Sequence, residues 1–190
     1  MHVRALSLSL LVAIPVTVGA AQSWKNTAPE SFKANAQITN DVGGAASVVA
    51  IQIDKYTSDD AHGALVKALK DQGNDAFLQA LHQAPAIGSV KIGARSVPVR
   101  WARERREGDG RRIAIVTDGA LFFAGAGAVD AKPTTGFDVA VLEFTIDSVG
   151  LGKGTMAGAA RVKAGGATGI EIEDYAGKRI TLVSVTRTIS

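Results

Sequence analysis

The sequence predicts an α+β protein with one domain, in which a largely antiparallel sheet of about eight strands carries an inserted helical hairpin at about residues 58–83. Three observations indicate this fold. Apolar and polar residues alternate with a period of two on both sides of the hairpin, the hairpin itself has helical periodicity, and short glycine-rich turns separate the strands. We expect the sheet to be strongly curled or barrel-like, because closure removes exposed strand edges; a two-sheet β-sandwich is the alternative.

The first 21 residues have the pattern of a secretory signal peptide. Arg4 precedes an apolar segment from Leu6 to Val18, and small residues follow up to Ala21. Cleavage after Ala20 and after Ala21 both satisfy the small-residue rule. The apolar segment is shorter than the roughly 20 residues of a membrane span. We therefore expect an exported, soluble protein of the bacterial periplasm or exterior, with no stable membrane insertion after cleavage.

Residues 22–31 are predicted to be a flexible lead-in to a single domain that spans 32–190. The domain begins with alternating apolar and polar residues over 32–39, which is typical of a strand with one solvated face. A turn at 41–44 leads to a second strand over 47–56, rich in valine and isoleucine. We expect these two strands to pair as a hairpin.

Two helices are predicted next. Thr57 and Ser58 can cap the N-terminus of the first helix. Asp59 and Asp60 lie in its first turn, where the helix dipole favours negative charge, and Gly73 can end it. Asn74 can cap a second, shorter helix that ends before Pro85.

The chain then returns to strands separated by short turns. The predicted strands with clear alternation are 89–92, 97–105, 111–117 and 137–147. The sequence Gly108-Asp109-Gly110 between two of them is a strong hairpin signal.

Four other segments are less regular. Residues 121–124 are predicted to be a short edge segment, and 125–136 a long loop. A glycine-rich turn is expected through Gly154, followed by 155–163, where alanine content suits a helix and the neighbouring hairpins favour a strand, which we prefer. Residues 169–174 and 178–187 are predicted to pair as a final hairpin.

Composition excludes several function classes. The 190-residue chain has no Cys, so disulfides, thiolate metal sites and cysteine nucleophiles are excluded. Its formal net charge is only +3 and aromatic residues make up 5%, so we expect no nucleic-acid binding. Because no His-x-x-x-His or Glu-x-x-His spacing occurs, we predict no metal site, and we expect no cofactor.

One candidate binding site is a cluster of arginines. Arg100, Arg103, Arg105 and Arg106 precede the predicted hairpin turn at 108–110, and Arg111 and Arg112 follow it. Three acidic residues lie among them, namely Glu104, Glu107 and Asp109. A solvated hairpin with cross-strand ion pairs explains this pattern. The alternative is a patch that binds an anion or an acidic cell-envelope partner through guanidinium groups.

Two carboxylates within apolar strands are the other candidates. Glu143 lies between Leu142 and Phe144, and Asp54 lies in the second strand. Either is an ordinary surface residue if it faces solvent, and a functional carboxylate if it faces a cavity. His62 and His82 fall on the predicted helices, where surface positions explain both.

The order of features resembles a group of secreted bacterial proteins to which no activity is assigned. The shared elements are Tyr56-Thr57-Ser58, Arg111-Arg112-Ile113 leading to Thr117-Asp118, Glu143 in a late strand, the glycine turn at 150–154 and a final hairpin. The resemblance implies a secreted single domain and no particular site.

We therefore expect an exported, non-enzymatic protein without catalytic residues. It would bind a small apolar or anionic ligand or a cell-envelope partner, because antiparallel barrels often enclose ligand cavities. A hydrolase or isomerase that uses Glu143 or Asp54 is the alternative.

Overall fold

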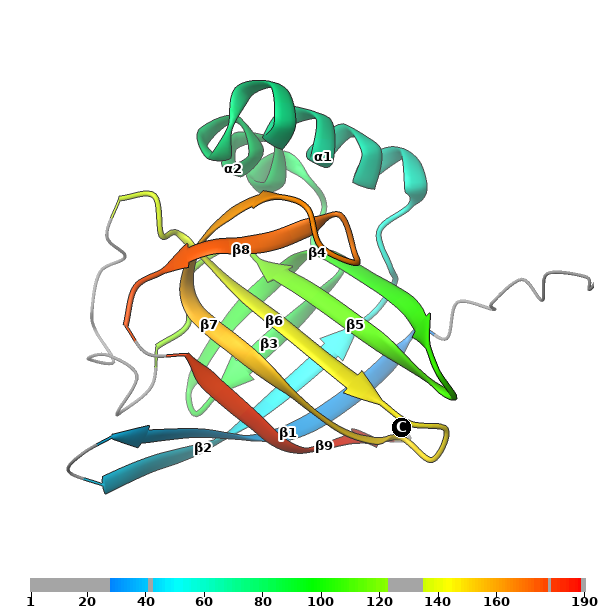
Figure 1. Ribbon diagram of the computed structural model, residues 1–190, viewed down its shortest axis with the longest axis vertical. Helices are drawn as coiled ribbons and strands as arrows, with labels where there is room; N and C mark the ends of the chain where they lie inside the picture. The colour runs from blue at the N-terminus through cyan, green and yellow to red at the C-terminus, as the bar shows by residue number, and fades with distance from the viewer. Residues whose placement is uncertain (1–27, 41–42, 123–134, 178, 189–190) are drawn as a thin grey trace, which may run out of the picture.

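The computed structural model describes residues 28–40, 43–122, 135–177 and 179–188, and it confirms the predicted α+β fold (Figure 1). The predicted signal peptide and most of the 125–136 loop lie outside the described residues. The elements are β1 (Glu30–Asn40), β2 (Gly43–Ile53), α1 (Asp59–Gln72), α2 (Asn74–Gln83), β3 (Gly88–Ile92), β4 (Arg95–Glu107), β5 (Gly110–Thr117), β6 (Val139–Ile146), β7 (Leu151–Ala164), β8 (Ile170–Tyr175) and β9 (Ile180–Thr188).

Eight of these strands form a closed antiparallel barrel. Their order is β6-β5-β4-β3-β2-β1-β9-β7, and pairing of β7 with β6 completes the circle. The closed sheet is the barrel-like form of the prediction and not the two-sheet sandwich. β8 pairs only with β7, as an additional strand beside the barrel (Figure 1).

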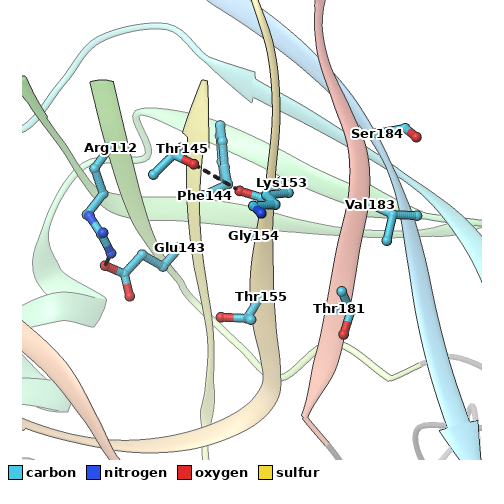
Figure 2. A pocket seen from close by; sticks show the side chains of 10 residues that line it. All are labelled: Arg112, Glu143, Phe144, Thr145, Lys153, Gly154, Thr155, Thr181, Val183 and Ser184. Carbon is cyan, nitrogen blue, oxygen red and sulfur yellow. Dashed lines mark hydrogen bonds and ion pairs between the residues drawn. The ribbon is translucent and has the colours of Figure 1, made fainter. Parts of the chain in front are cut away.

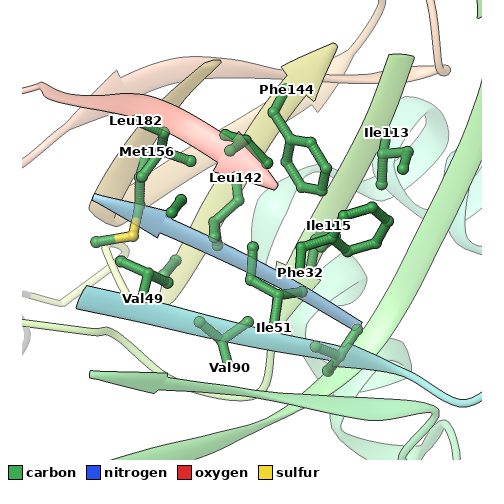
Figure 3. Packing of buried hydrophobic residues seen from close by; sticks show 14 of the residues in the cluster. Phe32, Val49, Ile51, Val90, Ile113, Ile115, Leu142, Phe144, Met156 and Leu182 are labelled. Atoms are coloured by element: carbon green, nitrogen blue, oxygen red, sulfur yellow. The ribbon is translucent and has the colours of Figure 1, made fainter. Parts of the chain in front are cut away.

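Side chains fill the interior of the barrel (Figure 3). Phe32 of β1 and Phe144 of β6 meet edge to face with ring centroids 5.1 Å apart, and both are buried. Leu142 and Met156 add further apolar volume from β6 and β7. Burying each such side chain stabilises the fold by about 1.5–3 kcal/mol. The alternation predicted from the sequence thus gives an apolar lumen.

The two helices cover part of the barrel's outer surface. Ser58 caps α1, since its hydroxyl accepts a hydrogen bond from the main-chain nitrogen of Ala61 at 3.3 Å, as the sequence predicted. A β-bulge lies in β4 between Val99 and Trp101. Residues two positions apart in a regular strand face the same side, but here Val99 packs in the barrel core and Trp101 packs beneath the helices. This second apolar cluster consists of Leu65, Leu69, Phe77, Leu78, Leu81, Trp101, Ala114, Val116, Val139, Val141, Ala157, Ala160, Val162 and Ile170.

The predicted final hairpin is wrong. β8 and β9 do not pair with each other; both lie along the same edge of β7, β9 beside its first half and β8 beside its second. The hairpin formed here is β7–β8. The sequence could not reveal this, because β7 is long enough at 14 residues to hold two partners end to end.

Smaller differences concern element boundaries. β2 ends at Ile53 and not at 56, and β7 begins at Leu151 although a turn was expected through Gly154. Within the described part of 121–124, Leu121 and Phe122 lie outside any strand, and the Leu121 main-chain nitrogen donates to the Gly158 carbonyl at 2.7 Å. Residues 155–163 are strand, as preferred.

Candidate functional site

A pocket of about 540 Å³ lies on the outer face of the barrel, where β5, β6, β7 and β9 meet (Figure 2). We call it the outer groove. Its lining residues are Arg112, Glu143, Phe144, Thr145, Lys153, Gly154, Thr155, Thr181, Val183 and Ser184. This volume falls within the range of about 300–1,000 Å³ that is usual for small-molecule sites.

The strand period of two puts the polar residues of the groove on one face. In β6, Leu142 and Phe144 belong to the barrel core, so Glu143 and Thr145 face outward. The strand registers then align polar side chains into two rows that cross the strands. The rows are Arg112–Thr145–Lys153 and Glu143–Thr155–Thr181.

Two glycines of β7 allow this strand to lie close to β6 beside the groove. A Cβ atom at Gly154 would lie 2.2 Å from the Glu143 main-chain oxygen, and one at Gly152 would lie 1.7 Å from the Thr145 main-chain oxygen. Gly154 is paired with Phe144, whose large side chain fills the barrel interior beside it. β7 can therefore approach β6 closely because these positions lack side chains.

Arg112 is the central cation of the groove, and two glutamates hold it. Its guanidinium donates to Glu107 at 2.5 and 2.7 Å and to Glu143 Oε1 at 2.7 Å. The hydrogen bonds to Glu107 and then to Glu143 raise the pKa of Arg112 above its usual value. Because its donors face these carboxylates, Arg112 orients Glu143 more than it attracts a free anion.

Lys153 differs from Arg112 in having no anionic partner. Its ammonium makes no ion pair or hydrogen bond with any residue that the structure describes, and the hydroxyls of Thr155, Thr181 and Ser184 likewise make none. One cation and three hydroxyls of the groove therefore have no partner in the described part of the chain and are open to solvent or to a ligand.

Ser184 adds backbone strain to the edge of the groove. Its φ of 51° makes it the one non-glycine residue with positive φ among the described residues. It lies in a β-bulge where the β7–β9 register shifts opposite Lys153. A left-handed conformation costs a non-glycine residue about 1–2 kcal/mol, and such strain gathers at functional sites.

The structure disperses the predicted arginine cluster. Arg100 donates to Asp118 at 2.7 Å and to the Ala84 carbonyl at 2.5 Å, which ties β4 to the end of β5 and to the segment after α2. Arg103 binds Asp59 at 2.8 Å and so holds the start of α1.

Arg105 and Arg106 lie at the end of β4, near the hairpin turn. Arg106 donates to the Gly108 carbonyl at 3.3 Å. Arg105 faces Arg112 across the β4–β5 pair, and of the described arginines in this hairpin it alone has no hydrogen-bond or ion-pair partner. Most of this predicted patch is thus engaged within the chain.

The two candidate carboxylates have different surroundings. Glu143 lines the outer groove, with its second oxygen, Oε2, unoccupied by any described donor. Asp54 follows the end of β2, is exposed, and accepts a hydrogen bond from the Gln52 side chain at 3.2 Å. The structure therefore does not bring the two together.

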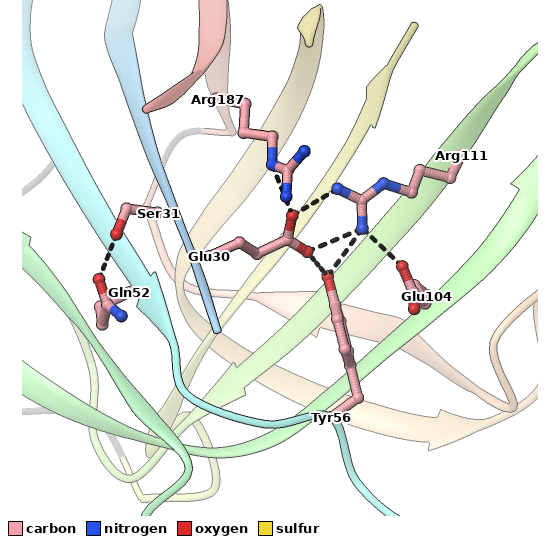
Figure 4. Close-up of polar contacts among 7 residues, drawn as sticks. All are labelled: Glu30, Ser31, Gln52, Tyr56, Glu104, Arg111 and Arg187. Atoms are coloured by element: carbon pink, nitrogen blue, oxygen red, sulfur yellow. Dashed lines mark hydrogen bonds and ion pairs between the residues drawn. The ribbon is translucent and has the colours of Figure 1, made fainter. Parts of the chain in front are cut away.

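A buried polar cluster at one end of the barrel was missed by the sequence analysis (Figure 4). Glu30 is buried and accepts hydrogen bonds from Arg111 at 2.5 and 2.7 Å and from the Tyr56 hydroxyl. Arg111 also donates to Glu104 at 2.6 Å, and Arg187 lies 3.1 Å from Glu30. The pKa of Tyr56 is raised above its usual value, chiefly because its hydroxyl is buried and secondly because it donates to the Glu30 carboxylate.

The prediction of a flexible lead-in over residues 22–31 is wrong at its end, because Glu30 and Ser31 belong to β1. A signal for the cluster was present in Arg111-Arg112. Consecutive residues of a strand point to opposite faces, so one of the two arginines had to face the barrel interior and find a buried anion.

The two described histidines, His62 of α1 and His82 of α2, each contact a polar group from outside the helices. The Trp101 indole N–H donates to His62 Nδ1 at 3.2 Å, so His62 is neutral with its proton on Nε2. Burial, with Arg103 nearby, lowers the pKa of His62. His82 Nδ1 lies 2.6 Å from Asp118 Oδ1; burial alone would raise the pKa of Asp118, but hydrogen bonds from Arg100 and His82 lower it overall.

Comparisons with known proteins give no relative for this chain. No protein-family model matches it, and neither curated proteins nor solved structures contain a match. In the described part of the chain, no group of three His, Cys, Asp or Glu residues could hold a metal ion. No helix among the described residues is long and apolar enough to cross a membrane.

Proposed function

We propose that this protein is an exported, non-enzymatic protein that binds a small anionic ligand in the outer groove. The observation that carries the proposal is Lys153, an ammonium without a described partner at a pocket whose other polar side chains are mostly hydroxyls. A ligand anion would give Lys153 a charge-assisted hydrogen bond, which is roughly twice as strong as a neutral one.

The groove is favoured over the lumen as the ligand site. The lumen holds the apolar side chains of the barrel core, including Phe32 and Phe144. An apolar ligand in the barrel would have to displace them, and a packed interior yields little room without a large loss of stability. The groove binds a ligand without repacking the core.

Native mass spectrometry of protein secreted with its own signal peptide tests this proposal. We expect a denatured mass that corresponds to cleavage after Ala20 or Ala21, and a native mass that is larger by one bound ligand. Lys153→Met should lose the added mass. Lys91→Met is the control and should keep the added mass, because this substitution removes the same charge from an exposed position on β3, away from the groove strands. An uncleaved chain would contradict export.

The proposal also has a test that does not depend on a ligand surviving purification. We expect addition of inorganic phosphate or acetate to the wild-type protein to shift the amide NMR signals of β6, β7 and β9 around the groove. Identical shifts in Lys153→Met, or shifts confined to other strands, would refute the groove as an anion site.

A carboxylate-dependent hydrolase or isomerase is the second candidate, and the position of Glu143 in the groove favours it over one that uses Asp54. The free Glu143 Oε2 could accept a proton from a bound substrate. Under this alternative, the protein would convert its retained ligand on incubation, and Glu143→Gln would retain the ligand unchanged.

A cell-envelope partner that binds the arginine hairpin remains a separate proposal. Arg105 is the member of the hairpin best placed for it, since Arg103 and Arg106 already contact groups of this chain. Charge reversal at Arg105 should then abolish partner capture, and unchanged capture would exclude the hairpin as the binding surface.

A further inference from the structure

We infer that the ligand of the outer groove is a polyhydroxylated anion, an acidic sugar in chemical class. The inference rests on the proposed function and names the ligand more closely. It comes from the polar groups of the groove that have no partner in the described part of the chain, because a bound ligand must satisfy each of them that it takes out of water.

The first requirement on the ligand is an anionic group. Lys153 carries three donors and no acceptor, and no described carboxylate pairs with it. A carboxylate or phosphate on the ligand would supply the missing acceptors and neutralise the charge.

The second requirement is a hydrogen-bond donor on the same ligand. Glu143 Oε1 is bound by Arg112, while Glu143 Oε2 faces no described donor. An ionised carboxylate oxygen can only accept hydrogen bonds, so a ligand without a donor would leave Oε2 desolvated and unpaired. A simple anion therefore satisfies Lys153 but not Glu143.

The third requirement is a set of groups that both donate and accept. Thr155 and Thr181 stand next to each other across the β7–β9 pair, and Ser184 lies on the same strand as Thr181. Their hydroxyls have no described partner, and each can donate one hydrogen bond and accept others. Ligand hydroxyls match such a row, because each can pair with a threonine or serine in either direction.

The charge balance agrees with a ligand of low net charge. Arg112 is offset by Glu107 and Glu143, and Lys153 brings the four groups to an equal number of positive and negative charges. A polyanion such as nucleic acid would meet two carboxylates here. A single anionic group beside several hydroxyls fits this arrangement better.

The test uses three probes that share a six-membered ring: glucuronate, which has a carboxylate and hydroxyls, glucose, which has hydroxyls alone, and cyclohexanecarboxylate, which has the carboxylate alone. Binding to the secreted wild-type protein, freed of any retained ligand, is followed by amide NMR titration. We expect glucuronate to bind at least about threefold more tightly than either other probe, since solvent screens the exposed Lys153 ammonium and the loss of its bond to the ligand, or of a partner for Glu143 Oε2, lowers the affinity by roughly that factor.

Variants assign the effect to individual groups. Lys153→Met should reduce glucuronate binding to the level of glucose, and Thr155→Val with Thr181→Val, which keep the strand-forming shape, should reduce it to the level of cyclohexanecarboxylate. Ser96→Ala removes an exposed hydroxyl of β4 outside the groove and should leave binding unchanged. The three-probe ranking on the wild-type protein remains decisive even if a variant fails to fold.

The outcomes separate this inference from the proposed function. If cyclohexanecarboxylate binds as tightly as glucuronate, the groove binds anions but does not recognise hydroxyls, and the acidic-sugar inference is overturned alone. If glucose equals glucuronate, Lys153 does not recognise charge, and both ideas fail. Both also fail if none of the three probes, nor inorganic phosphate, shifts the groove signals.

Discussion

Replacing Arg111 with methionine should destabilise the protein far more than the same change at its neighbour Arg112. The Arg111 side chain is 8% exposed, and its partners Glu30 and Glu104 are 0% and 14% exposed. Removing Arg111 leaves Glu30 buried with only part of its hydrogen bonding. Breaking a buried ion pair in this way costs about 3–5 kcal/mol. For a chain of this length, that corresponds to a fall of about 6–20 °C in Tm.

Arg112→Met is the matched control. The Arg112 side chain is 30% exposed, and its partners Glu107 and Glu143 are 39% and 33% exposed, so solvent screens the pairs and their loss should cost at most about 1 kcal/mol. Urea unfolding followed by circular dichroism measures both variants. On the Arg111→Met background, Glu30→Gln should restore part of the loss, because it removes the stranded charge. Equal destabilisation at positions 111 and 112 would refute the assignment of Arg111 to a buried network.

Four further predictions concern pH and the backbone. The pKa of His62 is lower in the folded protein than its ordinary 6.5, so the unfolded state binds the proton first; the free energy of unfolding should fall as pH drops through about 6.5, and His62→Gln should flatten this dependence in urea titrations. The pKa of Asp118 is held below 3.8, so its stabilisation is complete at neutral pH and lost as pH falls through the folded-state pKa; the deficit of Asp118→Asn should therefore shrink in acid. Ser184→Gly removes strain at φ 51° and should leave Tm unchanged or raised by a few degrees while weakening glucuronate binding, and a large drop in Tm would contradict the strain argument. Gly154→Ala should lower the free energy of unfolding by about 1–3 kcal/mol because its Cβ meets main chain, whereas Gly63→Ala, with open space at Cβ inside α1, should raise it by about 0.5–1 kcal/mol.

Local patterns in the sequence were sufficient for the extents of the helices and most strands. The predicted cap of α2 is wrong, because Asn74 is the first residue of that helix and its side chain accepts a hydrogen bond from the Val162 main-chain nitrogen at 3.2 Å. Ser58 caps α1 as predicted, because an N-cap depends on residues three positions apart. The turn at Gly108-Asp109 joins β4 to β5 as predicted, because a two-residue hairpin also depends on neighbours. The hairpin of β1 and β2 is confirmed for the same reason.

Long-range pairing was less accessible. The sequence predicted a β8–β9 hairpin from their adjacency, whereas both strands pair with β7. Arg111 and Arg112 look alike in the sequence, yet Arg111 binds Glu30 in the barrel end and Arg112 binds Glu143 in the groove. Glu30 is 81 residues from Arg111, so no local pattern connects them.

The sequence by itself determined most of the strand and helix segments, the apolar face of most strands, and the chemistries that the lack of cysteine excludes, because these depend on residue type and near neighbours. Only the tertiary structure decided that the sheet closes between β6 and β7, and that Glu143, Lys153 and Thr181 meet in one groove. The physical reason is that strand register brings together residues from four separate strands, and register is set by the packing of the whole barrel.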